Sequence, residues 1–159
     1  MRMKPVTQTV VALTALVALP AGLAQAAGDK TAEEWINDRK DTMAVVGAAT
    51  KSAACAVKGE GCPRKAEYLA LQARAIAYGG KLAPDAFREG PFPDADVDTT
   101  ALPKIWDNYD KFASGYDKMR KHALDMVEAA KNEDLKAYAA AFKKTTETCQ
   151  TCHDNFRED

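Results

Sequence analysis

Cys149-Gln150-Thr151-Cys152-His153 is the stretch around which this chain is organised. It has the spacing C-x-x-C-H, the attachment signal for c-type haem. Two thiols three residues apart lie on nearly the same face of a helix, where both can form thioethers to the haem vinyl groups. The histidine that follows is placed to bind the iron from the proximal side. We therefore predict one covalently attached haem c per chain, held by Cys149 and Cys152, with His153 as an axial ligand.

Other uses of two nearby cysteines fit this sequence less well. A thioredoxin-like redox pair is expected in a βαβ context, and the sequence shows no strand alternation. A structural zinc site needs four ligands, of which Cys55 and Cys62 could in principle supply two. A zinc or dithiol protein without haem is therefore a weaker interpretation than a haem protein.

Residues 1–26 have the pattern of a cleaved signal peptide. Arg2 and Lys4 form a positively charged N-terminal region, residues 10–19 are apolar, and Ala24-Gln25-Ala26 matches a cleavage site. The apolar run is shorter than the ~20 residues that span a bilayer. We expect export to the periplasm of a protein that is soluble rather than membrane-embedded.

The expected mature domain, residues 27–159, has an ordinary size for one domain. Loss of Arg2 and Lys4 changes the formal net charge from −1 to −3, and no basic bias indicates binding to nucleic acid. Cysteines in an exported chain favour disulfides. We predict a Cys55–Cys62 disulfide, because these residues flank the turn between the first two expected helices; two independent thiols are the alternative.

Apolar residues at alternating steps of three and four predict four helices. The first runs from a capping box at Thr31 and Glu34 to Lys58, where Gly59 stops it. The second begins at Pro63 and ends at Gly79-Gly80.

A long loop over residues 81–102 separates these two helices from the others. The third helix runs from Pro103 to about Lys131, and Asn132 is the N-cap of the fourth, which reaches Phe156. Cys149 and Cys152 fall on the inner stripe of this last helix. The fold class is therefore all-α, an antiparallel four-helix bundle with haem near the C-terminal end of the fourth helix.

The sixth iron position has four candidate ligands after the signal peptide: Met43, Met119, His122 and Met126. With a rise of about 1.5 Å per residue, the last three lie closer to the turn at Asn132 than the proximal histidine does. Met43 is left by elimination, and Gly47 one turn later either makes room for a flat ligand or is simply tolerated.

Three aromatic residues lie near the height of the proximal histidine on the third helix. Trp106, Tyr109 and Phe112 are therefore candidate walls of the haem pocket, although an ordinary core role would give the same pattern.

A C-x-x-C-H motif on the last of four helices resembles the class II c-type cytochromes, which include cytochrome c′ and its low-spin relatives c-556 and c-554. The resemblance covers residues 31–159, although the pair Cys55 and Cys62 is not general in the family. Its further points are Arg39 followed by Met43, Val57-Lys58-Gly59-Glu60, Pro103-Lys104-Ile105-Trp106 and Cys152-His153-Asp154-Asn155-Phe156-Arg157.

The resemblance implies that Met43 stands at the distal side of the haem. In low-spin members this residue is a methionine bound to iron, whereas in cytochrome c′ an apolar side chain blocks the site without binding. Arg39 is more typical of cytochrome c′, and the ending Asn155-Phe156-Arg157 is more typical of the low-spin forms. Arg39 and Arg157 are further expected haem contacts.

The favoured function is a periplasmic electron carrier with His153 and Met43 on the iron. The alternative is a five-coordinate protein that binds nitric oxide or carbon monoxide. No catalytic constellation is evident in the sequence, so we do not expect an enzyme. The expected partners are redox proteins, and a homodimer is expected only by analogy with the family.

Overall fold

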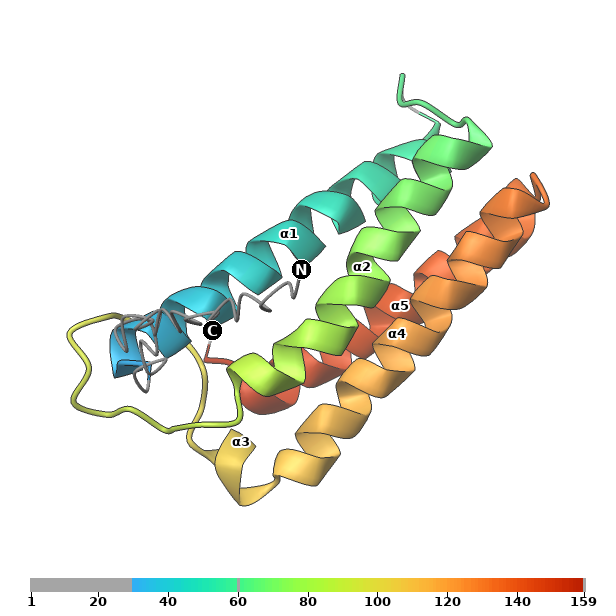
Figure 1. The fold of residues 1–159 in the computed structure, drawn as a ribbon. Coiled ribbons are helices and arrows are strands. Elements are labelled where there is room, and N and C mark those ends of the chain that lie inside the picture. Colours follow the sequence, from blue (N-terminus) through green and yellow to red (C-terminus); the bar gives the residue numbers. More distant parts are fainter. Residues whose placement is uncertain (1–29, 60, 159) are drawn as a thin grey trace, which may run out of the picture.

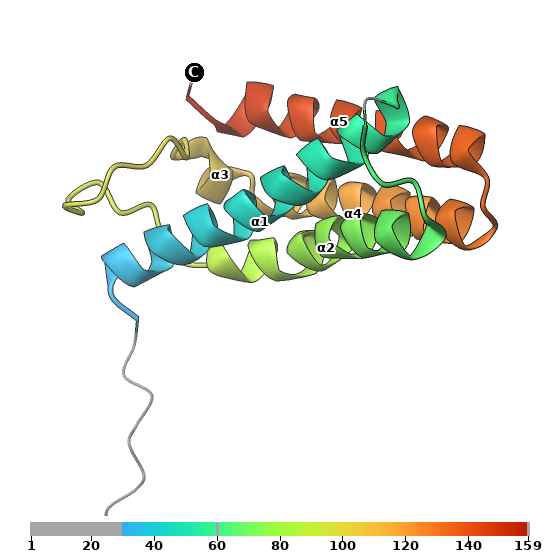
Figure 2. The same ribbon diagram turned by 90° about the horizontal axis from the view of Figure 1, so that it is seen from above.

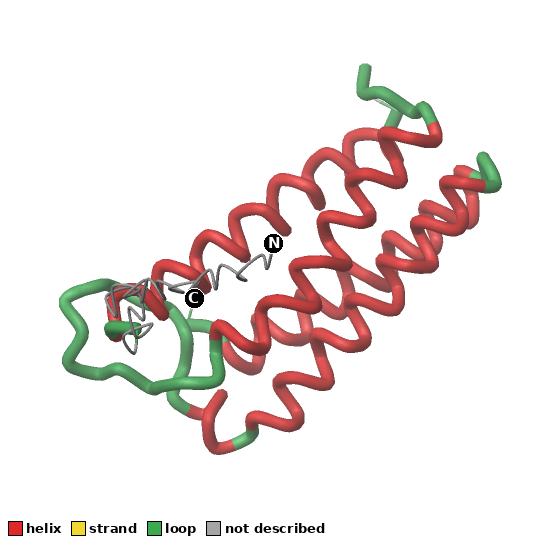
Figure 3. The backbone as a smooth tube through the Cα atoms, viewed as in Figure 1, coloured by secondary structure: helices red, strands yellow, loops and turns green. Residues whose placement is uncertain are grey.

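The computed structural model describes residues 30–59 and 61–158, which form long helices joined by loops (Figures 1 and 3). The predicted all-α four-helix bundle is confirmed, and the expected signal peptide lies outside the described residues. The helices are α1 (Ala32–Lys58), α2 (Ala66–Ala86), the short α3 (Lys104–Asp107), α4 (Tyr109–Lys131) and α5 (Leu135–Phe156).

Short turns join α1 to α2 and α4 to α5 at one end of the bundle, and the long connection between α2 and α4 lies at the other (Figure 1). Helix α2 packs closely against α1 and α4, and α4 packs against α5, whereas α1 and α5 touch only sparsely. Helix α1 crosses the other three obliquely (Figure 2). Space is therefore left between the first and the last helix of the chain.

Both predicted ends of α1 are confirmed. The Thr31 backbone N–H donates to Glu34 Oε2 at 2.7 Å, and the Glu34 N–H donates to Thr31 Oγ1 at 3.2 Å. Gly59 ends the helix in the left-handed region with φ 84°. This backbone conformation favours glycine, because other residues rarely adopt a positive φ.

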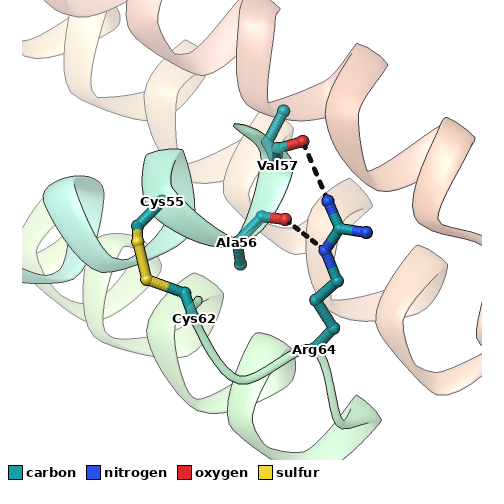
Figure 4. Close-up of a disulfide and its surroundings, with 5 residues drawn as sticks. All are labelled: Cys55, Ala56, Val57, Cys62 and Arg64. Carbon is teal, nitrogen blue, oxygen red and sulfur yellow. Dashed lines mark hydrogen bonds between the residues drawn. A yellow bond between two sulfur atoms is a disulfide. The ribbon is translucent and has the colours of Figure 1, made fainter. Parts of the chain in front are cut away.

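The predicted Cys55–Cys62 disulfide is present beside this helix end, with a Cα–Cα distance of 5.8 Å (Figure 4). Arg64 donates from Nε to the carbonyl oxygen of Ala56 at 2.8 Å and from Nη2 to that of Val57 at 3.5 Å. A cation on the last carbonyls complements the negative end of the helix dipole. The disulfide and Arg64 together fix the turn between α1 and α2.

The predicted end of the second helix at Gly79-Gly80 is wrong, because α2 continues to Ala86. Both glycines are buried within the helix. A Cβ on Gly79 would lie 2.1 Å from Val46 Cγ2, and one on Gly80 would lie 3.2 Å from the Tyr116 carbonyl oxygen. These glycines serve close packing of α2 against α1 and α4, so their absent side chains matter more than their flexibility.

Three other predicted boundaries differ from the structure. Helix α2 begins at Ala66, so Pro63 lies in the preceding turn. The predicted third helix is interrupted at Asn108, whose φ of −131° and ψ of 38° separate α3 from α4. The N-cap of α5 is Asp134, whose side chain accepts from the Ala137 N–H at 2.8 Å, while Asn132 caps the end of α4.

The core follows the predicted inner stripes. The largest fully buried side chains come from all the long helices and from α3: Ile36, Ile76, Ile105, Met126, Tyr138 and Thr145. Two buried hydroxyl groups away from the space between α1 and α5 find partners in the chain, whereas the buried His122 Nδ1 makes no hydrogen bond. Tyr138 donates its hydroxyl to the Leu69 carbonyl at 3.3 Å, and Thr145 donates to the Ala141 carbonyl at 3.0 Å.

Candidate haem-binding site

A cavity of about 670 Å³ occupies the space between α1 and α5, with α4 as its floor. Met43 lines it from α1, Met119 from α4, and Cys149, Cys152 and His153 line it from α5. The residues that sequence analysis assigned to haem attachment and iron ligation therefore meet in one cavity.

The two thiols on α5 are half-buried and not joined to each other. Burial, followed by the neighbouring Cys149, raises the pKa of Cys152 to about 11. Burial also raises the pKa of Cys149, whose Sγ lies 3.9 Å from Met119 Sδ. Both side chains are thus neutral thiols at neutral pH, exposed to the same cavity.

His153 lies one residue further along, at the end of α5. Its pKa is lowered first by burial and then by the charge of Arg157, while Asp154 opposes the shift. Arg157 Nη1 lies 3.3 Å from His153 Nδ1. A lowered pKa favours the neutral imidazole, which is the form that binds metals.

Met43 approaches the cavity from α1, across from α5. Its Sδ lies 4.0 Å from the hydroxyl oxygen of Tyr116, a residue of α4 that is 6% exposed. Burial raises the pKa of Tyr116, so its hydroxyl stays protonated and can donate to the sulfur. Gly47, one turn after Met43, also lines the cavity, and a Cβ there would meet no atom within 4 Å.

The charges around the cavity have a single sign. Arg39, Lys40, Lys51 and Arg157 line it, whereas no carboxylate does so among the described residues. The remaining lining is largely apolar. A haem has a flat apolar ring and two propionate groups, so thiols, a neutral histidine, apolar walls and four cations fit this group in both shape and charge.

Arg39 is buried and holds one rim of the cavity together. Its Nε donates to the Ala86 carbonyl at 2.8 Å and one Nη donates to the Glu89 carbonyl at 2.6 Å. Its guanidinium also lies about 5 Å from the ring centroids of Phe87 and Trp106. Arg39 thus joins α1 to the connection after α2, with three of its five donors left for other partners.

The three aromatic candidates take different positions. Phe112 lines the cavity, whereas Trp106 and Tyr109 lie outside its lining. The Trp106 ring nitrogen donates to the Phe87 carbonyl at 3.0 Å, and the Tyr109 hydroxyl donates to the Pro84 carbonyl at 2.6 Å. Trp106 thus supports the start of the connection that Arg39 also holds, and Tyr109 supports the last turn of α2.

The elimination by height along the bundle needs one correction. Met119 was placed too far from the haem site, yet it lines the cavity beside Cys149, one turn below His153. The cavity is deep enough to reach both levels. His122 and Met126 do not line it.

Sequence reasoning also missed Tyr116 as a partner of Met43, and Lys40 and Lys51 at the cavity rim. No signal in the sequence distinguishes Tyr116 from an ordinary buried aromatic residue. Lys40 and Lys51 directly follow Arg39 and Thr50, which also line the cavity, and this adjacency is the one sequence signal that could have found them.

Residues 34–157 match the family model described as Cytochrome C'. The chain belongs to the cytochrome c′ family. It is 33% identical to cytochrome c' of Rhodopseudomonas palustris over 91% of this chain and 92% of that protein. It is 29% identical to cytochrome c-556 of Agrobacterium fabrum over 94% of each chain. The crystal structure of cytochrome c' from Rubrivivax gelatinosus matches with a TM-score of 0.71 and 26% identity, over 81% of this chain and 98% of that one.

Membership of the cytochrome c′ family confirms the predicted cofactor, one covalently attached haem c per chain. The relatives carry both family names, cytochrome c' and c-556, so the comparisons leave the sixth ligand open. Among residues 30–59 and 61–158, no helix has the length and apolar character needed to cross a membrane.

Proposed function

We propose that this protein is a periplasmic electron carrier whose haem iron is held by His153 and Met43. One observation carries the proposal: the two side chains line a single cavity from α5 and α1, the helices that border it on either side. Neither helix needs to move for both residues to face a group bound between them.

When bound, the haem supplies a one-electron couple, and the chain supplies its surroundings. Cys149 and Cys152 would hold it through thioether bonds, and His153 and Met43 would supply the ligands of its iron. Ligation by methionine and histidine raises the reduction potential. Phe112 and the apolar lining exclude water, and the cations at the rim offer partners for the propionates. No general base or nucleophile is needed for this role, and we propose no enzymatic activity.

The position of the sulfur favours ligation over simple blocking of the iron. A thioether sulfur has two lone pairs, so Met43 can accept from Tyr116 with one and face the iron with the other. The contact with Tyr116 orients the side chain through its sulfur rather than through its terminal methyl group. An apolar blocking residue would have no use for such a contact.

Met43→Ala, compared with Met119→Ala, tests this proposal by visible absorption. We expect a low-spin oxidised spectrum for the wild type and for Met119→Ala, but a high-spin spectrum for Met43→Ala. Reduced Met43→Ala should also bind carbon monoxide faster than the wild type, because no methionine has to leave first. A high-spin wild type, or loss of the low-spin spectrum in Met119→Ala alone, would contradict the assignment of Met43.

A second function, binding of nitric oxide or carbon monoxide at a five-coordinate iron, is favoured by the space at Gly47. Gly47 lines the cavity one turn after Met43 and adds no side chain to the wall on that side. This function predicts rapid, tight binding of carbon monoxide by the reduced wild type. Gly47→Leu should then slow binding strongly, whereas it should have little effect if displacement of methionine limits the rate.

A further inference from the structure

A second hollow, a groove of about 320 Å³, runs along the outer side of the seam between α4 and α5. Three lysines line it: Lys111, Lys118 and Lys144. Glu147 is the only carboxylate among its lining residues. The groove therefore carries local positive charge on a chain whose expected mature form is net negative.

The groove lysines differ from three other lysines on the same two helices. Lys121, Lys131 and Lys143 each have a carboxylate partner one turn away, at 3.5, 2.7 and 3.8 Å. Within the described part of the chain, the ammonium groups of the three groove lysines have no ion-pair partner. The single groove carboxylate, Glu147, is the one that pairs with Lys143.

The groove also shares a wall with the haem cavity. Five residues line both hollows: Phe112, Gly115, Thr148, Cys152 and Phe156. Gly115 adds no side chain to this wall, and a Cβ there would meet no atom within 4 Å. The wall contains Cys152, one of the two thiols assigned to the haem, so a molecule seated in the groove lies close to the attached cofactor.

We propose that this lysine groove docks an acidic surface of the redox partner protein, with electron exchange through the wall at Cys152. The proposal rests on the electron-carrier function. Complementary charge speeds encounter and fixes orientation. Because the mature chain is expected to be net negative, a groove whose lysines have no ion-pair partner and which adjoins the haem cavity favours the approach of an acidic partner.

Rapid mixing of the reduced holoprotein with hexacyanoferrate(III) tests the groove. One electron passes from the protein to the reagent, which becomes hexacyanoferrate(II); no bond is made or broken and no proton moves. The test variant is Lys111→Glu/Lys118→Glu/Lys144→Glu. The matched control, Lys58→Glu/Lys65→Glu/Lys136→Glu, makes the same change in net charge on exposed lysines near the opposite end of the bundle.

We expect the groove variant to react about tenfold more slowly at low ionic strength, with a flatter salt dependence, and the control to change far less. If both variants slowed equally, the change in net charge alone would explain the effect, and the proposal would be overturned. So would slowing caused only by Lys40→Glu/Lys51→Glu, because exchange would then occur at the rim of the haem cavity.

A polyglutamate chain separates a docking surface from a small-anion site. Added in excess, it should slow the reaction of the wild type and leave the groove variant unaffected. Inhibition by phosphate but not by polyglutamate would overturn the docking surface in favour of a small-anion site. The groove and control variants share the ligation of the wild type, so their comparison does not depend on the sixth ligand. A high-spin wild-type spectrum would therefore contradict Met43 ligation without deciding the groove.

Discussion

The two ends of the bundle use their sulfur atoms in opposite ways. At the end with the short turns, Cys55 and Cys62 are bonded to each other. At the other end, Cys149 and Cys152 are not bonded to each other, and they line the same cavity as Met43 and Met119. At the first end the chain cross-links itself, whereas at the second end the side chains surround a cavity that the cofactor would fill. Variants at the two ends should therefore separate stability from spectroscopy.

The largest effect is expected from His153→Ala at the open end. Loss of a metal ligand belongs to the few single changes that cost about 4 kcal/mol or more. We expect a changed haem spectrum and a large fall in the thermal midpoint of the holoprotein, measured by absorption and circular dichroism. His122→Ala is the control, because His122 does not line the cavity. An unchanged spectrum in His153→Ala would refute the proximal assignment.

Removal of the disulfide tests the closed end. Cys55→Ser/Cys62→Ser should lower the free energy of unfolding by about 2–3 kcal/mol, an estimate from the entropy of closing a short loop. The haem spectrum should stay as in the wild type, since neither cysteine lines the cavity. Denaturant titration gives the stability, and a spectral change at native conditions would show that the two ends are coupled.

Gly79→Ala probes the packing between the two ends. The new Cβ would lie 2.1 Å from Val46 Cγ2, and overpacking of this kind costs about 1–3 kcal/mol. The double variant with Val46→Ala should recover part of that loss, because the clashing methyl group is removed. Two additive losses in a double-mutant cycle would show that the clash is not between these residues.

The smallest effect is expected from Tyr116→Phe, which removes the hydroxyl near Met43. Loss of one buried hydrogen bond costs about 1 kcal/mol, so carbon monoxide should displace the methionine about fivefold faster in the reduced protein. Tyr138→Phe is the matched control, because it removes a buried hydroxyl that bonds to Leu69 instead. Equal rates in wild type and Tyr116→Phe would exclude a role for this contact.

The sequence predicted the elements whose signals are local. The capping box at Thr31 joins residues within one helical turn, and the stop at Gly59 depends on the glycine itself. C-x-x-C-H is a contiguous motif. These features can be predicted without knowing which residues pack against them, so sequence pattern and residue propensity were sufficient to locate them.

The errors arose where a distant helix decides the outcome. Gly79-Gly80 has the composition of a helix end, but Val46 and Met119 on other helices make it a packing site. Met119 lines the cavity although it lies below the height of His153, because the depth of the cavity cannot be read from residue spacing; its exclusion as an iron ligand stays a prediction. Trp106 and Tyr109 do not line the cavity, since their hydrogen bonds direct them to Phe87 and to Pro84 at the end of α2.

The sparse contact between α1 and α5 has a consequence for how the chain is cross-linked. Met43 and His153 are 110 positions apart in the sequence, so ligation by both would close a loop that spans most of the mature protein. Closing a loop of about 100 residues restricts the unfolded chain by about 4–5 kcal/mol, more than the short disulfide loop does. Unlike the disulfide, this cross-link opens whenever a ligand such as carbon monoxide displaces the methionine. Ligand binding at the distal side would then release the first helix from the last, and would lower the resistance of the whole bundle to unfolding.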